Sequence, residues 1–261
     1  MGSRVPVVTG LGVVSSAGIG AGRFWEGLFT SEHHFREITL FKPDGLPNRM
    51  ASEIGPWVPG FEDLDETLLA QSRITAFAAV ALREAHARSG TEASSVDRVL
   101  VGTTCGDIAS QEASIRAARV DGYDEPMRLR ADSEFRASLS THCADVHVKL
   151  LVTACSAGNL AAIRAAQMIE AGEADVVVAG GAEAFSRMAF VGFARMRGMA
   201  AEQCRPFSEA RDGLLLGEGA AFAVLESAEH AAARGAVPLA EVSGYGMSCD
   251  AKHPAAPDST G

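Results

Sequence analysis

The feature that most constrains this chain is an apolar run that ends near a cysteine and is followed directly by a helix-forming segment. Residues 148–152 are typical of a buried β-strand, and Cys155 follows after one threonine and one alanine. Small residues around the cysteine allow a sharp turn from strand to helix. The positive end of the helix dipole favours a thiolate at such a position. The pattern indicates either a nucleophile or a buried structural cysteine, and on its own it leaves both readings open.

Composition narrows the classes of protein to consider. The 261 residues are 47% hydrophobic and carry a net charge of −10, which suits one large domain or two small ones and argues against a nucleic-acid partner. An acidic protein partner would need a local basic patch to dock. The sequence shows no membrane-spanning run and no signal-peptide pattern. Its five cysteines are scattered without zinc-site spacing, so we expect free thiols, no metal site and a cytoplasmic location.

Hydrophobic periodicity predicts a layered α/β unit in which strands and helices alternate. Buried strands are expected over residues 5–15, 98–102, 148–152 and 174–181, and helices over residues 68–89, 108–120 and 160–172. Near the end of the chain we expect a pair of strands within 211–226, a short helix over 228–234 and a strand over 240–244. The remaining long stretches are irregular over 30–64, polar and charged over 121–144, and loop-rich over 182–207.

Two of these segments invite a more specific interpretation. Gly10-Leu11-Gly12 suggests a dinucleotide loop, but Ser15 stands where the third glycine belongs, so a structural turn without a cofactor is the better interpretation. The helix over 160–172 has only one narrow polar stripe, formed by Arg164, Gln167 and Glu170. We therefore expect that helix to be covered by protein on several sides.

Six segments, taken together and in order, resemble the β-ketoacyl-acyl-carrier-protein synthases of the thiolase-like superfamily. They are Val7 to Gly12, Thr153 to Gly158, Asp175 to Glu183, Cys204 to Phe207, Arg211 to Gly213 with Gly217 to Ala220, and Asp250 to His253 with Ala256-Pro257. The resemblance implies an α/β fold with α/β/α/β/α layers. Residues 1–261 would form its N-terminal domain, the first half-repeat with insertions, and a missing second half would complete it.

The resemblance also implies a reaction. Cys155 would accept an acyl group from an acyl carrier protein, and a malonyl-type extender would then lose carbon dioxide and attack the thioester in a Claisen condensation. The Cys155 backbone N–H would supply one oxyanion donor. By the same resemblance, Cys105 and Phe193 match positions that line the acyl pocket, and Asp250 and His253 match a gating loop. Plain core packing for Phe193 and a capped turn for Asp250 and His253 are the alternatives.

The chain departs from the family pattern in one respect. Family members carry two catalytic histidines and a lysine in a second half, and none of the seven histidines here lies in the family's His-Gly-Thr-Gly-Thr context. We therefore expect the C-terminal half on another segment or chain, within a homodimer or heterotetramer. An ester- or amide-forming acyltransferase and a non-catalytic scaffold remain as alternatives, and the retained Cys155 argues against a chain-length-factor subunit. Fatty-acid and polyketide pathways both stay open.

Overall fold

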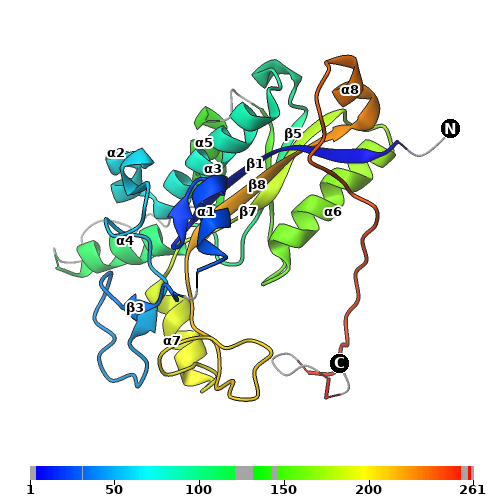
Figure 1. Ribbon diagram of the computed structural model, residues 1–261. Helices are drawn as coiled ribbons and strands as arrows, with labels where there is room; N and C mark the ends of the chain where they lie inside the picture. Colours follow the sequence, from blue (N-terminus) through cyan, green and yellow to red (C-terminus); the bar gives the residue numbers. More distant parts are fainter. Residues whose placement is uncertain (1–3, 31, 121–131, 143–145, 254–257, 260–261) are drawn as a thin grey trace.

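The structure, a computed structural model, describes residues 4–30, 32–120, 132–142, 146–253 and 258–259. Among these residues the main element is a seven-stranded sheet in the order β2-β1-β8-β7-β5-β6, with β9 paired to β1 (Figure 1). Its strands are β1 Pro6–Ser15, β2 Gly18–Ile19, β5 Arg98–Gly102, β6 Val148–Leu151, β7 Val176–Glu183, β8 Gly219–Ser227 and β9 Ala240–Glu241. A separate two-stranded sheet pairs β3 Arg36–Glu37 with β4 Met50–Ala51.

The direction of the strands decides where functional groups can meet. Strand β5 pairs in parallel with both β6 and β7, whereas β8 is antiparallel to both β7 and β1. Most residues of β5 and β7 are buried, as expected for strands covered on both faces. Because β5, β6 and β7 run the same way, their carboxyl ends lie together at one edge of the sheet.

Helices cover both faces of this sheet (Figure 1). Helix α3 packs against β1, β8 and β7, and α6 packs mainly against β7 and β5. The helices are α1 Ala21–Gly27, α2 Glu66–Gln71, α3 Arg73–Ser89, α4 Ile108–Val120, α5 Asp132–His142, α6 Ala157–Glu170, α7 Arg187–Arg195 and α8 Ala228–Ala233, with 3-10 turns at Phe61–Asp63 and Ala93–Ser95. An apolar core lies beneath each of these two helices, one around Phe77 and Val224 under α3 and one around Ala165 and Ile169 of α6. A smaller apolar cluster forms around Phe190 of α7. The predicted layered α/β class is confirmed.

The two glycines near the N-terminus have a packing role. Gly10 and Gly12 lie inside β1, so the expected turn is wrong. A Cβ at Gly12 would lie 1.9 Å from the carbonyl oxygen of Ala81, and one at Gly10 would lie 2.1 Å from that of Ala85. Both carbonyls belong to α3, so the glycines let this helix lie directly on the strand.

The expected helix over 68–89 is two helices. Ser72 separates α2 from α3 with an extended backbone (φ −158°), and its hydroxyl accepts a hydrogen bond from the Thr75 N–H. This hydrogen bond from the backbone to the Ser72 side chain replaces a helical one, so the helix ends there. The spacing of apolar residues in the sequence nevertheless continues through Ser72 without a break. Periodicity alone therefore missed the break.

Other expected boundaries also changed. Within 211–226 only one strand, β8, forms, and the final strand is limited to Ala240–Glu241. Helices α5 and α7 form in stretches where no helix was expected; α5 buries Phe135 and Leu139 beneath the sheet.

Helix α6 buries one face, including Ala161 and Ile169, while its polar stripe and outer apolar side chains stay partly exposed. The described residues thus cover α6 on one side only. No helix in the described ranges is long and apolar enough to cross a membrane.

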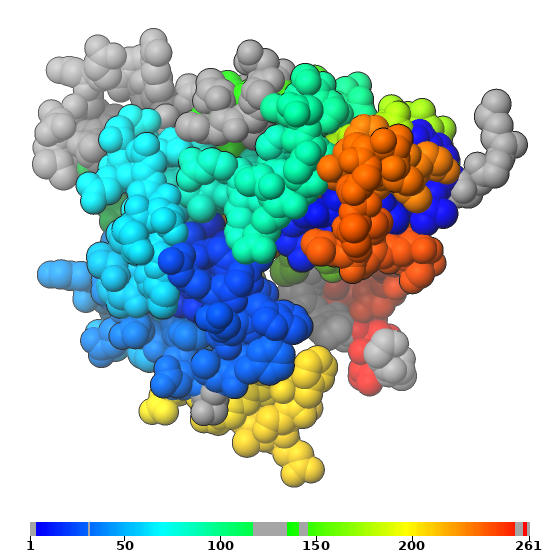
Figure 2. Space-filling view, turned by 45° about the horizontal axis from the view of Figure 1, so that its top comes forward, coloured from blue at the N-terminus to red at the C-terminus, as the bar shows by residue number. Residues whose placement is uncertain are grey.

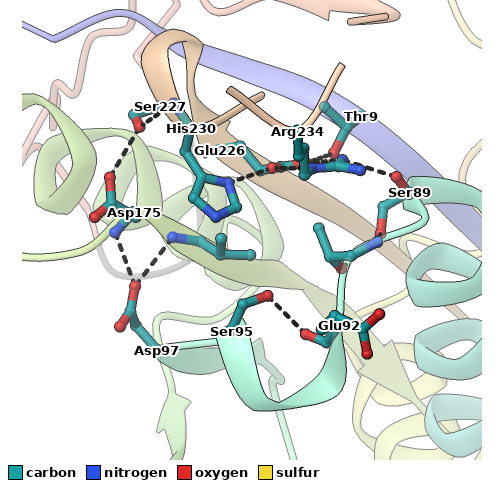
Figure 3. A network of polar contacts seen from close by, with 12 residues as sticks. Thr9, Ser89, Glu92, Ser95, Asp97, Asp175, Glu226, Ser227, His230 and Arg234 are labelled. Atoms are coloured by element: carbon teal, nitrogen blue, oxygen red, sulfur yellow. Dashed lines mark hydrogen bonds and ion pairs between the residues drawn. The ribbon is translucent and has the colours of Figure 1, made fainter. Parts of the chain in front are cut away.

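A buried carboxylate joins the C-terminal strand and helix to the rest of the sheet. The Glu226 side chain is fully buried and accepts hydrogen bonds from Thr9 Oγ1, from Arg234 Nε at 2.8 Å, and from His230 Nδ1 at 2.7 Å if that nitrogen carries the proton (Figure 3). Arg234 also donates to the Ser89 carbonyl at the end of α3, at 2.7 Å. Figure 2 shows α8 (orange) lying beside β1 (blue) and the teal end of α3.

This network sets the protonation of Glu226. Burial opposes its charged form, but the hydrogen bonds from Arg234, Thr9 and His230 outweigh burial and hold the pKa of Glu226 below its usual value. The folded state therefore releases this proton more readily than the unfolded state. Its stabilising contribution is present above the unfolded-state pKa, about 4.3, and is lost as pH falls through the folded value.

We predict that acidification from pH 7 to below pH 4 lowers the free energy of unfolding in part through Glu226. Glu226→Gln should unfold more easily at pH 7, by about 3 kcal/mol, because Arg234 loses its buried partner. It should also show a shallower loss of stability between pH 5 and 3. Urea denaturation at each pH measures both effects, and an identical pH slope in the variant would contradict the assignment.

Candidate active site

The chain turns sharply between β6 and α6, and Cys155 lies in that turn. Ala154 has a left-handed backbone (φ +50°), and Ser156 is the N-cap residue of α6. The Ser156 hydroxyl donates to the Thr153 carbonyl at 3.0 Å, and the Ala157 N–H donates to the Ala154 carbonyl at 3.1 Å. The predicted strand–turn–helix is confirmed. Cys155 is exposed, which does not fit a buried structural cysteine.

Glycines allow the first turn of α6 to pack closely against the sheet. A Cβ at Gly102, the last residue of β5, would lie 2.2 Å from the Ala157 carbonyl carbon and 2.4 Å from the Gly158 nitrogen. A Cβ at Gly181 of β7 would lie 3.3 Å from the Gly158 Cα. The start of the helix is therefore held at backbone distance from two parallel strands.

A cavity of about 580 Å³ opens beside this turn. Cys155, Cys105 and Phe193 all line it, so the structure brings together three of the five side chains expected to have a role. Much of the remaining wall is apolar or small, including Val13, Phe24, Ala189, Leu216 and Ala220. Its volume and lining suit an apolar ligand next to Cys155.

Glu183, at the end of β7, organises one wall of the cavity. Its carboxylate accepts hydrogen bonds from the Thr104 N–H at 2.6 Å, the Cys105 N–H at 3.2 Å and the Thr103 hydroxyl at 3.3 Å. Burial raises the pKa of the Cys105 thiol, and the negative charges of Glu183 and Glu112 raise it further. Cys105 is thus suited to line the cavity as a neutral thiol.

A second buried carboxylate, Glu218, lies in the same wall. It pairs with Arg73 at the start of α3 and accepts from the N–H groups of Ile54 at 2.8 Å and Phe185 at 3.0 Å. It therefore ties together three segments that are far apart in the sequence. Sequence reasoning gave neither Glu183 nor Glu218 a role, although an acid at the end of a buried apolar strand was a usable signal for Glu183.

Phe193 reaches the cavity from α7. The N-terminus of this helix is held by Glu112 of α4, which accepts from the Arg187 N–H at 3.0 Å and from the Met188 N–H. On the same helix Phe190 is buried against Phe185, whereas Phe193 is only partly buried at the cavity wall. Plain core packing, the alternative considered for Phe193, therefore describes Phe190 better than Phe193.

Asp250 and His253 lie away from this site. Both are exposed, neither lines the cavity, and the Asp250 carboxylate accepts from the Asp258 N–H at 2.8 Å. Figure 1 shows the segment after β9 leaving the sheet and running away from its layers. The structure does not bring these two residues to Cys155, and their gating role stays a prediction. The described residues contain no group of three or more His, Cys, Asp or Glu arranged to hold a metal ion.

We predict that Gly102→Ala destabilises the turn that carries Cys155. The added Cβ would overlap the Ala157 backbone, and such overpacking costs about 1–3 kcal/mol. Thermal unfolding measures the loss. Gly192→Ala is the matched control, because a Cβ there meets nothing within 4 Å and alanine suits the interior of α7. Equal stability of the two variants would contradict the close packing.

We also predict that iodoacetamide at pH 7.5 modifies Cys155 at least about tenfold faster than Cys105, because the thiolate is the reacting form and Cys105 is kept protonated. Peptide mass spectrometry after timed quenching measures both rates, with the exposed Cys249 as the reference. Modification of Cys105 should accelerate as pH rises. Equal rates for Cys105 and Cys155 at pH 7.5 would contradict the prediction.

Comparison with known proteins places this chain in a family. Residues 4–231 match the family described as "Beta-ketoacyl synthase, N-terminal domain". The chain is 33% identical to 3-oxoacyl-[acyl-carrier-protein] synthase 2 of Rhizobium meliloti, covering 99% of this chain and 67% of that protein. It is 34% identical to a polyketide beta-ketoacyl synthase of Streptomyces cyaneus, covering 96% of this chain and 65% of the relative.

The fold agrees with these matches. The solved ishigamide ketosynthase/chain length factor superposes with a TM-score of 0.85 at 34% identity, over 97% of this chain and 65% of that one. Nodulation protein E of Rhizobium meliloti is likewise covered over only 65% of its length, so this chain spans about two thirds or less of several relatives. The chain belongs to the β-ketoacyl synthase family and carries that family's N-terminal domain.

Proposed function

We propose that Cys155 accepts an acyl group from an acyl-carrier-protein thioester and holds it for condensation with a malonyl-type extender. The observation that carries the proposal is the exposed cysteine at the start of α6, beside a largely apolar cavity of about 580 Å³. The cavity offers room for the acyl chain, and the turn presents the sulfur to the incoming carbonyl.

The first step is a thioester exchange. The Cys155 sulfur attacks the acyl carbonyl carbon, a new S–C bond forms, and the carbonyl oxygen becomes an oxyanion that the Cys155 backbone N–H can stabilise. Collapse of this intermediate breaks the bond to the carrier sulfur. The carrier leaves as a thiol with the proton that Cys155 gave up, so no oxidant or cofactor takes part.

The second step requires groups outside this chain. Loss of carbon dioxide from the extender leaves a carbanion, which forms a C–C bond to the acyl carbon and releases the Cys155 sulfur. We assign the two histidines of this step to a C-terminal ketosynthase half on another segment or chain, within a homodimer or heterotetramer. The partly exposed outer side of α6 supports this assignment.

The pathway is proposed at the level of the family. Its members named above include a 3-oxoacyl-[acyl-carrier-protein] synthase and a polyketide beta-ketoacyl synthase, at similar identities of 33% and 34%. We accordingly propose fatty-acid or polyketide chain extension in the cytoplasm, with an acyl carrier protein as the donor.

We predict that incubation with a hexanoyl-acyl-carrier-protein adds one hexanoyl group to the full chain. Intact-mass spectrometry should show the increment on the wild type and none on Cys155→Ala, because that variant lacks the accepting sulfur. Cys249→Ala is the matched control and should be acylated like the wild type, since Cys249 is exposed but lies outside the cavity. An unacylated wild type, or an increment that survives Cys155→Ala, would overturn the proposal.

A further inference from the structure

We propose that Thr104 and Glu183 are positioning residues that fix the direction of the Cys155 backbone N–H. The inference rests on the proposed acyl transfer, in which this N–H faces the oxyanion. It is carried by one chain of contacts, from the Glu183 carboxylate through the Thr104 loop to the Ala154 carbonyl.

The peptide between Ala154 and Cys155 is the reason that this chain of contacts matters. Its C=O and N–H belong to one planar trans unit and point in opposite directions, so a group that holds the carbonyl also aims the N–H. Two donors hold the Ala154 carbonyl: the Ala157 N–H at 3.1 Å and the Thr104 hydroxyl at 3.2 Å. The first belongs to the turn itself, and the second comes from the loop that follows β5.

The backbone of Ala154 needs such support. Its φ of +50° is a conformation that residues other than glycine rarely adopt. Such conformations persist where the surrounding structure holds them. A hydroxyl from outside the turn is a direct way to hold this one, because it bonds the carbonyl of the strained residue.

Glu183 in turn holds the Thr104 loop. One carboxylate oxygen accepts from the Thr104 N–H at 2.6 Å, and the other accepts from the Cys105 N–H at 3.2 Å. The Thr103 hydroxyl donates to the same carboxylate and also accepts from the Gly106 N–H at 2.9 Å. Hydrogen bonds to an ionised carboxylate are stronger than those between neutral groups, so this loop has little freedom.

Sheet topology makes the arrangement possible. Glu183 ends β7, Thr104 follows β5 and Ala154 follows β6, and these three parallel strands are neighbours. Thr104 is itself exposed, so replacing it removes a hydrogen bond without emptying the core. A substitution at Thr104 therefore tests the hydrogen bond to the Ala154 carbonyl without changing the packing of the core.

The test compares Thr104→Val, which keeps the side-chain shape without the donor, with Thr104→Ser, which keeps the donor. Single-turnover acylation of Cys155 in the full chain by hexanoyl-pantetheine should slow about tenfold in Thr104→Val, a fraction of the 100- to 1,000-fold loss typical of removing an oxyanion donor. Alkylation by iodoacetamide, which forms no oxyanion, should stay within about twofold of the wild type. Thr104→Ser should retain both rates.

A second measurement does not depend on acyl transfer. Amide hydrogen exchange at Ala157, whose N–H donates to the Ala154 carbonyl, should be at least about threefold faster in Thr104→Val and in Glu183→Gln than in the wild type when followed by NMR, because the turn loses its outside support. Thr104→Ser should exchange like the wild type.

The outcomes separate the two proposals. Unchanged exchange at Ala157 in Thr104→Val would overturn the positioning role, as would equal slowing of acylation and alkylation, which indicates general damage to the turn. A wild type that is not acylated, combined with faster exchange in Thr104→Val, would overturn the proposed function and leave the contact from Thr104 to the turn established.

Discussion

The parallel pairing of β5 with both β6 and β7 is the constraint on which the rest of the site depends. It brings three strand ends together, so that the turn carrying Cys155, the loop carrying Cys105 and the carboxylate of Glu183 share one edge of the sheet. Gly102 and Gly181 then allow the first turn of α6 to rest on those ends at backbone distance. A side chain at Gly102 would separate the helix from the sheet and move the cysteine with it.

Glutamates add polar links between segments of this fold that are far apart in the sequence. Glu218 connects the start of α3 to two loops, and Glu226 connects β8 and α8 to β1 and the end of α3. Glu183 connects the end of β7 to the loop that carries Thr104 and Cys105. Each accepts several donors, which is the condition under which a carboxylate is tolerated in a protein interior. The cavity wall thus owes its shape to charged groups as well as to its apolar lining.

Local pattern predicted the elements with strong periodicity, including the turn at Cys155 and most of the main sheet. It missed the break at Ser72, because a capping hydroxyl leaves the apolar period unchanged. It also missed α7, whose Phe190 packs against Phe185 and against Phe41, which is far away in the sequence. The places of Cys105 and Phe193 beside Cys155 came from resemblance to a family, not from residue spacing. The same resemblance pointed to Asp250 and His253, which the structure leaves away from the cavity.

The sequence by itself determined that a cysteine stands in the turn between a strand and a helix, because that arrangement depends only on neighbouring residues. Tertiary structure decided what surrounds the cysteine. Glu183, Thr104 and Phe193 line the cavity beside Cys155 from positions 28 to 51 residues away in the sequence, as their numbers show. Such contacts arise from strand pairing and helix packing across the sheet, and no local period encodes them.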